Sequence, residues 1–134
     1  MPDGEVVVFP DVEALLVTAL TASLAARGRA RSVATKVPNP RPARFVRLLR
    51  TGGLRMNVLM DAATITVEAW EPTEAEAART AQLVRGLVHA LDDLAGAPVF
   101  DVGELAGPQN YPDPATASVR YVATYQITVG AAPA

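Results

Sequence analysis

The stretch TITVEAWEPTEAEAARTAQLVRGLVHALDDLAG, residues 64–96, decides the fold. Its first part, Thr64–Glu71, alternates between apolar and polar side chains, which predicts a strand with one buried face. The side chains expected to point inward are Ile65, Val67 and Ala69. Pro72 has no amide hydrogen for a sheet ladder, and we expect it to stop the strand.

A helix is predicted directly after this strand. Thr73 and Glu76 have the spacing of a capping box, which satisfies free amide groups at a helix start. The apolar positions that follow step mainly by three and four residues, and they are Ala77, Ala81, Val84, Leu87, Val88, Leu91, Leu94 and Ala95. An apolar stripe of this kind is typical of a helix buried against a sheet. Gly96 and Pro98 are expected to close the helix.

Upstream of the strand, a first helix is predicted over Val12–Ala26, with Asp11 as its N-cap and Gly28 at its end. A short strand is expected near Val33–Val37. The prolines of Pro38–Pro42 exclude a helix and a central strand, so this segment should be an extended connector.

The residues Arg44–Thr51 alternate between two faces and predict another strand, ended by Gly52 and Gly53. Phe45, Arg47 and Leu49 are expected on one face of it, and Val46, Leu48 and Arg50 on the other. Leu54–Ala63 is expected to be a connector of mixed character.

Three elements are expected after the long helix. These are a short strand near Val99–Val102, a stiff exposed loop over Gly107–Pro114 and a long strand over Ser118–Val129. The last strand alternates over its whole length, so we expect it at the centre of the sheet.

These elements predict an α+β fold, with a mostly antiparallel sheet of four to five strands and two helices packed on one face. The length of 134 residues fits a single domain, residues 1–134, with flexible ends at 1–8 and 130–134. The other face of the sheet would carry polar, β-branched and aromatic side chains, among them Glu68, Trp70 and Arg120. This mixture indicates that a second protein covers it.

Composition excludes several classes of protein. No run approaches the ~18 apolar residues of a membrane span, and the first nine residues carry two acids where a secretory signal needs a basic start. We therefore expect a protein that is made and kept in the cytosol and enters no membrane. The absence of cysteine excludes disulfides, thiolate metal sites and thiol catalysis.

Charge is sorted along the chain. Residues 27–55 contain no Asp or Glu but nine basic side chains: Arg27, Arg29, Arg31, Lys36, Arg41, Arg44, Arg47, Arg50 and Arg55. The formal charge is −4 for residues 1–26, +9 for 27–55 and −7 for 56–134, which gives the total of −2. Such asymmetry indicates a partner surface, either a polyanion or an acidic patch on a protein, which includes another copy of the same chain.

The sequence carries no motif for catalysis or for a cofactor. The phosphate-binding patterns GxxxxGK[ST] and GxGxxG and the nucleophile pattern GxSxG do not occur. His89, the single histidine, has Asp92 and Asp93 near it on the predicted helix, but a specific metal site needs three or four convergent ligands. We therefore expect no enzyme, no cofactor and no metal site.

Two kinds of partner are weighed for the basic segment. Modules that stack nucleic-acid bases need exposed aromatic side chains, and the segment offers only Phe45. The pI of about 5.3 also argues against a dedicated DNA binder. Self-assembly fits better, because the basic region of one copy can lie on the acidic region of the next, and such head-to-tail contacts close into rings.

The string VPNPRPARFVRLLRTGG, Val37–Gly53, resembles the signature region of the tail terminator proteins of long-tailed bacteriophages, also called tail completion or minor tail proteins. In that family a proline-limited segment with arginine leads into a strand that ends in Arg-x-Gly-Gly, here residues 50–53. The turn at residues 112–114, before the strand that begins at Arg120-Tyr121, is similar to the closing segment of the family. The resemblance extends from the first helix to about Val129, and no family pattern covers Leu54–Ala63.

The resemblance implies a structural protein of the virion, assembled in the bacterial cytoplasm, that forms a hexameric ring on the tail tube. Such a ring stops polymerisation of the tube protein, offers a surface to the head-tail connector proteins and surrounds the passing DNA. It implies no catalysis. The alternatives are a head-tail connector or stopper protein of the neck and, ranked lower, a small nucleic-acid-binding α+β domain. The residues expected at the subunit or tail-tube interface are Arg41, Arg44, Arg47, Arg50, Gly52, Gly53, Trp70, Pro112, Asp113 and Arg120.

Overall fold

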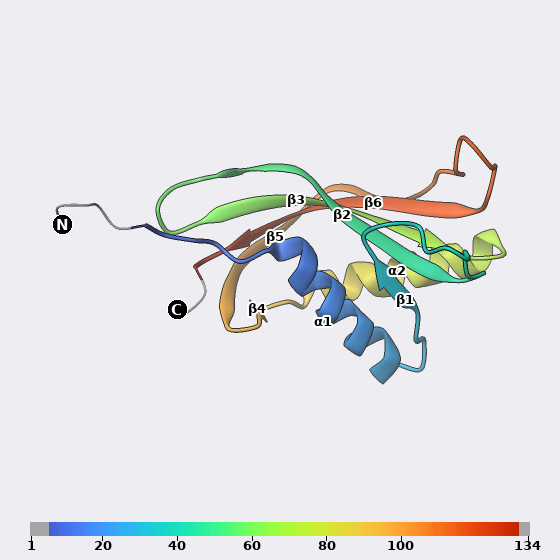
Figure 1. Cartoon of the computed structure of the whole chain (residues 1–134), viewed down its shortest axis with the longest axis horizontal. Coiled ribbons are helices and arrows are strands. Elements are labelled where there is room, and N and C mark those ends of the chain that lie inside the picture. Colours follow the sequence, from blue (N-terminus) through green and yellow to red (C-terminus); the bar gives the residue numbers. More distant parts are fainter. Residues whose placement is uncertain (1–5, 132–134) are drawn as a thin grey trace.

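One sheet, covered on one face by two helices, makes up the computed structural model, which describes residues 6–131 (Figure 1). Residues 1–5 and 132–134, part of the chain ends expected to be flexible, lie outside the described residues. The elements in chain order are α1 (Val12–Ala26), β1 (Ser32–Ala34), β2 (Phe45–Arg55), β3 (Asp61–Trp70), α2 (Glu74–His89), β4 (Asp93–Leu94), β5 (Ala97–Asn110) and β6 (Arg120–Val129).

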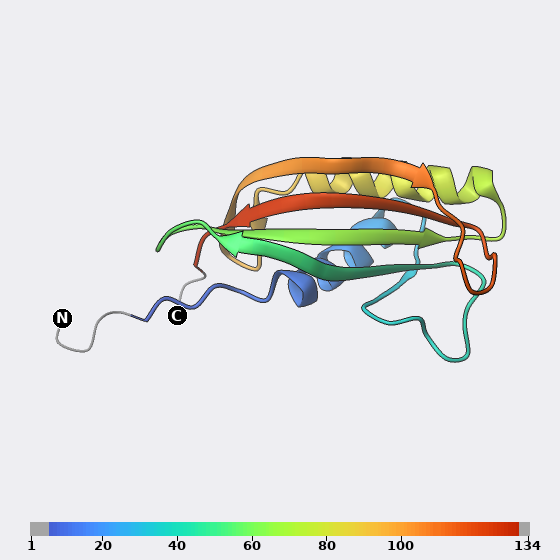
Figure 2. The ribbon, with the colours of Figure 1, turned by 90° about the horizontal axis from the view of Figure 1, so that it is seen from above.

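The sheet has six strands in the order β1-β2-β3-β6-β5-β4. Strand β1 is parallel to β2, and every other neighbouring pair is antiparallel. The α+β class and the mostly antiparallel sheet are therefore confirmed, and β6 lies near the centre as predicted (Figure 2). The predicted four to five strands are roughly compatible with this sheet, whose four long strands are flanked by two very short ones, β1 and β4.

Helix α1 has the predicted bounds, and its cap explains them. The Asp11 carboxylate accepts a hydrogen bond from the Ala14 amide at 3.1 Å, which satisfies one of the free donors at the helix start. Gly28 follows the helix with a φ of +72°, a conformation that glycine adopts without strain. The buried side chains of this helix are Val12, Leu16, Leu20 and Leu24, which repeat every four residues and face the β1 and β2 side of the sheet.

Helix α2 starts where the sequence predicts, with the Thr73 hydroxyl accepting from the Glu76 amide, but it ends at His89. The prediction that it runs to Ala95 and is closed by Gly96 was wrong. Ala95 and Gly96 both have positive φ, +51° and +89°, and form the two-residue turn between β4 and β5. Leu94, which fits the helical spacing, reaches the core from β4 instead.

The paired glycines do not end a strand. Strand β2 continues through Gly52 and Gly53 to Arg55, and β3 begins at Asp61, so the expected connector shrinks to the turn at residues 56–60. The register shifts between Arg50 and Gly52, which marks a β-bulge. At Gly53, where φ is +113°, a β-carbon would collide with the backbone oxygen of Ala62. Glycine here lets the two strands stay paired, so this pair of glycines signals a bulge and not an end.

Strand β5 is much longer than the predicted Val99–Val102 and takes up residues 107–110 of the predicted loop. Its pairing with β6 shifts register three times, so two-residue periodicity breaks down along it and hides the strand in the sequence. Strand β1 is shorter than predicted, and residues 35–44, which contain the three prolines, form a connector as expected.

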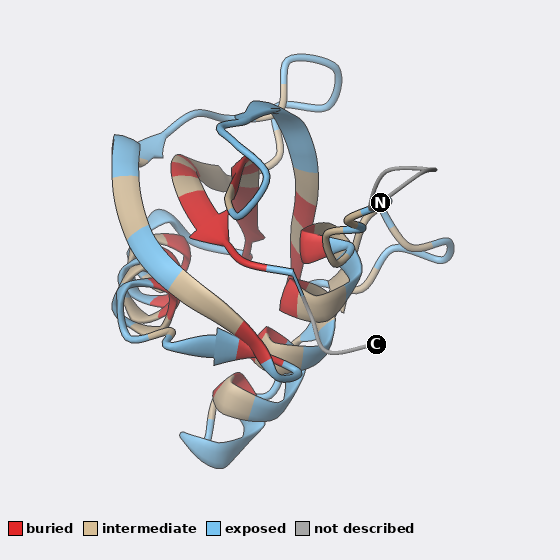
Figure 3. Cartoon of the chain, turned by 90° about the vertical axis from the view of Figure 1, so that its left-hand side faces the viewer, coloured by how far each residue is buried: buried red, intermediate tan, exposed pale blue. Residues whose placement is uncertain are grey.

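The core lies between the helices and the inner face of the sheet. The predicted inward side chains Ile65, Val67 and Ala69 are all buried, as are Val46 and Leu48 of β2. Buried positions gather on the central strands β3 and β6, the end of β2 from Arg50 on is exposed, and β5 after Ala97 carries only exposed and half-buried positions (Figure 3). Both long edges of the sheet are thus accessible, while the centre is not.

Candidate interaction surfaces

The face of the sheet opposite the helices carries a stack of rings and guanidinium groups. Phe45 and Trp70 are cross-strand partners, with their ring centroids 5.1 Å apart and their planes 18° apart. The guanidinium carbons of Arg41 and Arg120 lie 5.6 and 5.4 Å from the Trp70 ring, a cation–π distance. The structure therefore brings together Arg41, Trp70 and Arg120, three of the residues predicted for the interface.

Glu68 lies beside this stack and was not among the predicted site residues. Its carboxylate accepts from the Trp70 indole nitrogen at 3.1 Å and from a guanidinium nitrogen of Arg47 at 3.3 Å. A nitrogen of Arg120 lies 3.5 Å from it, and its side chain is only 8% exposed. Two guanidinium groups share one buried carboxylate, so the group retains a net positive charge on the open face of the sheet.

Glu71 and Glu76 hold two further arginines of the basic segment. Arg31 makes a two-point contact with the fully buried Glu71 carboxylate, at 2.8 and 3.1 Å. Arg44 lies 3.8 Å from Glu71 and donates to Glu76 at 3.1 Å. The hydrogen bond from Arg44 keeps the pKa of Glu76 below its ordinary value.

Asp61, at the start of β3, forms an ion pair with Arg50 at 3.0 Å. The backbone amide of Arg50 donates at 2.7 Å to the carboxylate of Glu13 on α1, which satisfies a donor at the outer edge of β2. Four of the nine basic side chains in the acid-free segment are therefore paired with carboxylates of the same chain. The segment is much less of a free positive surface than its sequence suggests.

Sequence reasoning missed these carboxylates because the pairs join residues 11 to 40 positions apart. The cross-strand pairing of Arg47 with Glu68 would have been visible only with the β2–β3 register in hand. Within residues 6–131, the other five basic side chains of the segment make no ion pair: Arg27, Arg29, Lys36, Arg41 and Arg55.

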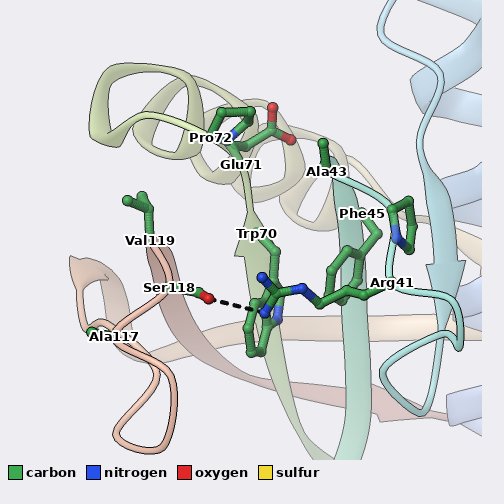
Figure 4. A pocket seen from close by; sticks show the side chains of 10 residues that line it. Arg41, Ala43, Phe45, Trp70, Glu71, Pro72, Ala117, Ser118 and Val119 are labelled. Carbon is green, nitrogen blue, oxygen red and sulfur yellow. Dashed lines mark hydrogen bonds between the residues drawn. The ribbon is translucent and has the colours of Figure 1, made fainter.

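A cavity of about 370 Å³ opens where β3 ends and β6 begins (Figure 4). Its wall includes Arg41, Phe45, Trp70, Pro72 and Ser118. Figure 4 shows the Arg41 side chain lying across Trp70 and reaching Ser118, whose hydroxyl it contacts at 2.9 Å. We call this end of the sheet, with the loop at residues 111–119, the cavity end.

Pro112 and Asp113 belong to the cavity end, in the loop between β5 and β6. The hydroxyl of Thr116 donates to the Asp113 carboxylate at 2.6 Å and keeps the pKa of that carboxyl below its ordinary value. Arg120 donates to the carbonyl of Tyr111 at 3.0 Å, which ties the loop to the ring stack. Gly52 and Gly53 lie near the opposite end of the sheet, so the predicted site residues form two separate groups.

The opposite end is apolar and was not predicted. The last residues of β2 and the turn of the β2–β3 hairpin expose four large apolar side chains, Leu54 (73%), Met56 (57%), Val58 (63%) and Leu59 (69%). Val58 and Leu59 also line a groove of about 420 Å³ with Pro98, Phe100 and Gly130. We call these residues the apolar end. The sequence signal was the apolar residues at 54, 56 and 58, in a stretch that was interpreted as a connector.

A small polar cluster joins α2 to β5. Arg85 makes two contacts of 2.7 Å with Glu104, and His89 lies 3.3 Å from the same carboxylate. The hydrogen bond from Arg85 keeps the pKa of Glu104 below its ordinary value, and the pKa of Arg85 rises in turn. Burial raises the pKa of Tyr125, which packs edge-on against His89, to about 12. The cluster links a helix to a strand and contains no nucleophile beside a base.

No family model and no curated protein matches the chain. Within residues 6–131, no three or more His, Asp or Glu side chains gather as they would around a metal ion. None of the helices there combines the length and the apolar character that crossing a bilayer requires.

Proposed function

We propose that this chain is a structural virion protein that forms a ring at the head-proximal end of a phage tail tube. The ring stops polymerisation of the tube protein and provides the joining surface for the head. Its partners are further copies of the chain, six in the ring that the resemblance implies, together with the tube protein and the head-tail connector proteins. The motif string at Val37–Gly53 supports this assignment, and it lies in the connector and in β2.

The apolar end is the observation that carries the proposal. Monomeric proteins rarely expose many large apolar side chains side by side, because each loses free energy in contact with water. Here Leu54, Met56, Val58 and Leu59 follow one another on a hairpin that extends beyond the helices (Figure 1). Such a surface fits a protein partner and does not fit a polyanion.

Pairing within the chain also favours protein assembly over nucleic-acid binding. Affinity for DNA comes mainly from lysine and arginine side chains that are free to neutralise phosphates. Arg31, Arg44, Arg47 and Arg50 already contact carboxylates of their own chain. Contact with passing DNA is a secondary role in this proposal.

The two ends of the sheet differ, as a ring between two different neighbours requires. The apolar end lies on the β2–β3 hairpin, whereas the cavity end carries Arg41 and the loop with Pro112 and Asp113. A ring with unlike ends contacts the tube with one and the head side with the other. In the heterologous contacts of a ring every copy points the same way, so these ends line up on opposite faces.

The test uses the purified chain and the tube protein of the same phage. Electron microscopy of the chain alone should show closed rings with a central opening, and its addition to polymerising tube protein should shorten the tubes. The Leu59→Asp variant should fail either to form rings or to shorten the tubes. Val37→Asp, a change at an exposed apolar position in the proline-rich connector, should leave ring formation and tube shortening unchanged. An absence of rings, together with tubes of unchanged length, would show that the proposal is wrong.

A further inference from the structure

The outer edges of β2 and β5 are open over much of their length. Strand β1 pairs only with Phe45–Arg47 of β2, and β4 pairs only with Ala97–Pro98 of β5. Beyond these stretches, within residues 6–131, neither outer edge has a further strand partner. Two backbone amides there are already taken, since Arg50 donates to the Glu13 carboxylate and Val99 donates to the carbonyl of Asp92, so the open groups lie in residues 51–55 and 100–106. Open strand edges carry unpaired amide and carbonyl groups and are templates for another strand.

The two open stretches lie at the same height in the sheet. The ladders through β3 and β6 connect Arg55 to Val99 at one end, and Leu49 to Ala106 at the other. Residues 49–55 of β2 therefore face outward on one side at the level where residues 99–106 of β5 face outward on the opposite side (Figure 2). A copy placed beside another without a shift along the strands brings these stretches together.

Strand direction is also compatible. Three successive antiparallel pairings separate β2 from β5, so the two strands run in opposite directions. Rotation about an axis along the strands keeps each strand direction unchanged. The β5 strand of a second copy then meets β2 as an antiparallel neighbour, which is the pairing that fits the rest of this sheet.

The charges of the two edges are complementary. Residues 49–55 carry Arg50 and Arg55 and no acid, and residues 99–106 carry Asp101 and Glu104 and no base. Along the ladders Arg50 is level with Glu104, and Leu54, next to Arg55, is level with Asp101. The exposed side chains of Leu54 on one edge and of Phe100 and Leu105 on the other add apolar surface.

We propose that the β2 edge of one copy pairs with the β5 edge of the next, so that the sheet continues from copy to copy. This inference rests on the ring of the proposed function and names its subunit contact. The pairing is heterologous, because two different edges meet, and contacts of this kind generate rings when the rotation closes. Pro108, which has no amide hydrogen, sets the limit of the paired stretch on β5.

The charge complementarity of the two edges is best tested at Arg55 and Asp101. Arg50 and Glu104 are already engaged with Asp61 and Arg85 of their own chain, so their reversal would disturb the fold as well. Arg55 and Asp101 make no ion pair within residues 6–131, and both are exposed. Arg55 does lie over the Phe9 ring at 5.3 Å and donates to the carbonyl of Asn57, so recovery in the double variant is what separates the subunit contact from the loss of these contacts. Arg55→Asp alone and Asp101→Arg alone should each weaken assembly at least tenfold, and the double variant should recover most of it. Arg79→Asp, an exposed charge on α2 that makes no ion pair within residues 6–131, should assemble like the wild type.

Cross-linking tests the contact directly, because the chain has no cysteine of its own. The Leu54→Cys, Phe100→Cys double variant, treated with a flexible bismaleimide, should give a ladder of covalent oligomers on a denaturing gel. Each single variant should stay monomeric there, because a heterologous contact places no residue against its own copy. The Leu54→Cys, Val37→Cys pair serves as the matched control and should give no ladder.

Sedimentation of the same double variant before cross-linking tests ring formation separately from the edge pairing. Rings that give no ladder would overturn the edge pairing and leave the proposed function in place. A monomer at tens of micromolar, for the wild type and the variant alike and both with and without the tube protein, would overturn both.

Discussion

Replacing Glu68 by glutamine should lower the free energy of unfolding by about 2–3 kcal/mol. Removing one partner of a fully buried ion pair costs about 3–5 kcal/mol, because the other charge is left without compensation. Arg120 and Arg47 are 11% and 28% exposed, so water compensates part of that loss. The glutamine oxygen still accepts from the Trp70 indole, so the substitution changes charge with little change in shape.

The assay is urea unfolding followed by the fluorescence of Trp70, the only tryptophan, with linear extrapolation to water. All variants are compared at one chain concentration, since assembly adds stability by mass action. Asp92→Asn is the control, because Asp92 is exposed and its side chain makes no ion pair within residues 6–131, so its effect should stay within about 0.5 kcal/mol. If Glu68→Gln costs no more than this control, the reasoning about the buried cluster is refuted.

Three further predictions concern single positions. Tyr125→Phe removes a buried hydroxyl that has no hydrogen-bond partner within residues 6–131, and it should raise the free energy of unfolding by about 1–3 kcal/mol in urea titrations. In the wild type the pKa of Tyr125 rises to about 12 from 10.0, so stability that is complete below pH 10 should fall between pH 10 and 12, and the phenylalanine variant should lack this part of the fall. Gly53→Ala should destabilise the hairpin by more than about 1 kcal/mol, whereas Gly86→Ala, at an open position inside α2, should stabilise by up to about 1 kcal/mol; thermal unfolding of both decides this. Arg31→Met leaves the buried Glu71 only the longer contact with Arg44 and should cost about 3 kcal/mol, and a loss below 1 kcal/mol would contradict the assigned role of that pair.

Local signals predicted the regular elements well. The bounds of α1 follow from Asp11 and Gly28, and the start of α2 follows from Thr73 and Glu76, because caps depend on neighbouring residues only. The end of α2 was wrong because Leu91 and Leu94 satisfy helical spacing, although a two-residue turn at Ala95 places Leu94 in a strand. Sequence periodicity alone does not distinguish these two solutions.

The strands were predicted less completely, for one physical reason. Bulges insert single residues, as at residues 50–52 of β2 and at three places in β5, and each insertion interrupts the alternation that identifies a strand. The end of the β2–β3 hairpin, residues 52–63, and most of β5 were therefore not predicted from the sequence. The apolar end, which carries the proposed function, lies on that hairpin.

The basic segment shows that the sequence also predicts the site incompletely. Its arginines were predicted at an interface from the charge pattern and from the resemblance of residues 37–53, and the structure places Arg47 against Glu68 and Arg50 against Asp61. Reversal of either arginine would break a contact within its own chain. Its effect on assembly would therefore not isolate a subunit contact. Asp101, which is exposed and makes no ion pair or side-chain hydrogen bond within residues 6–131, offers the cleaner variant.

Solution mass tests the central claim, that the chain assembles into a ring, most directly. Sedimentation velocity at tens of micromolar should give a closed species of about 85 kDa, six copies of the 14.1 kDa chain, either alone or after addition of the tube protein. A single species at the mass of one chain under both conditions would contradict the account.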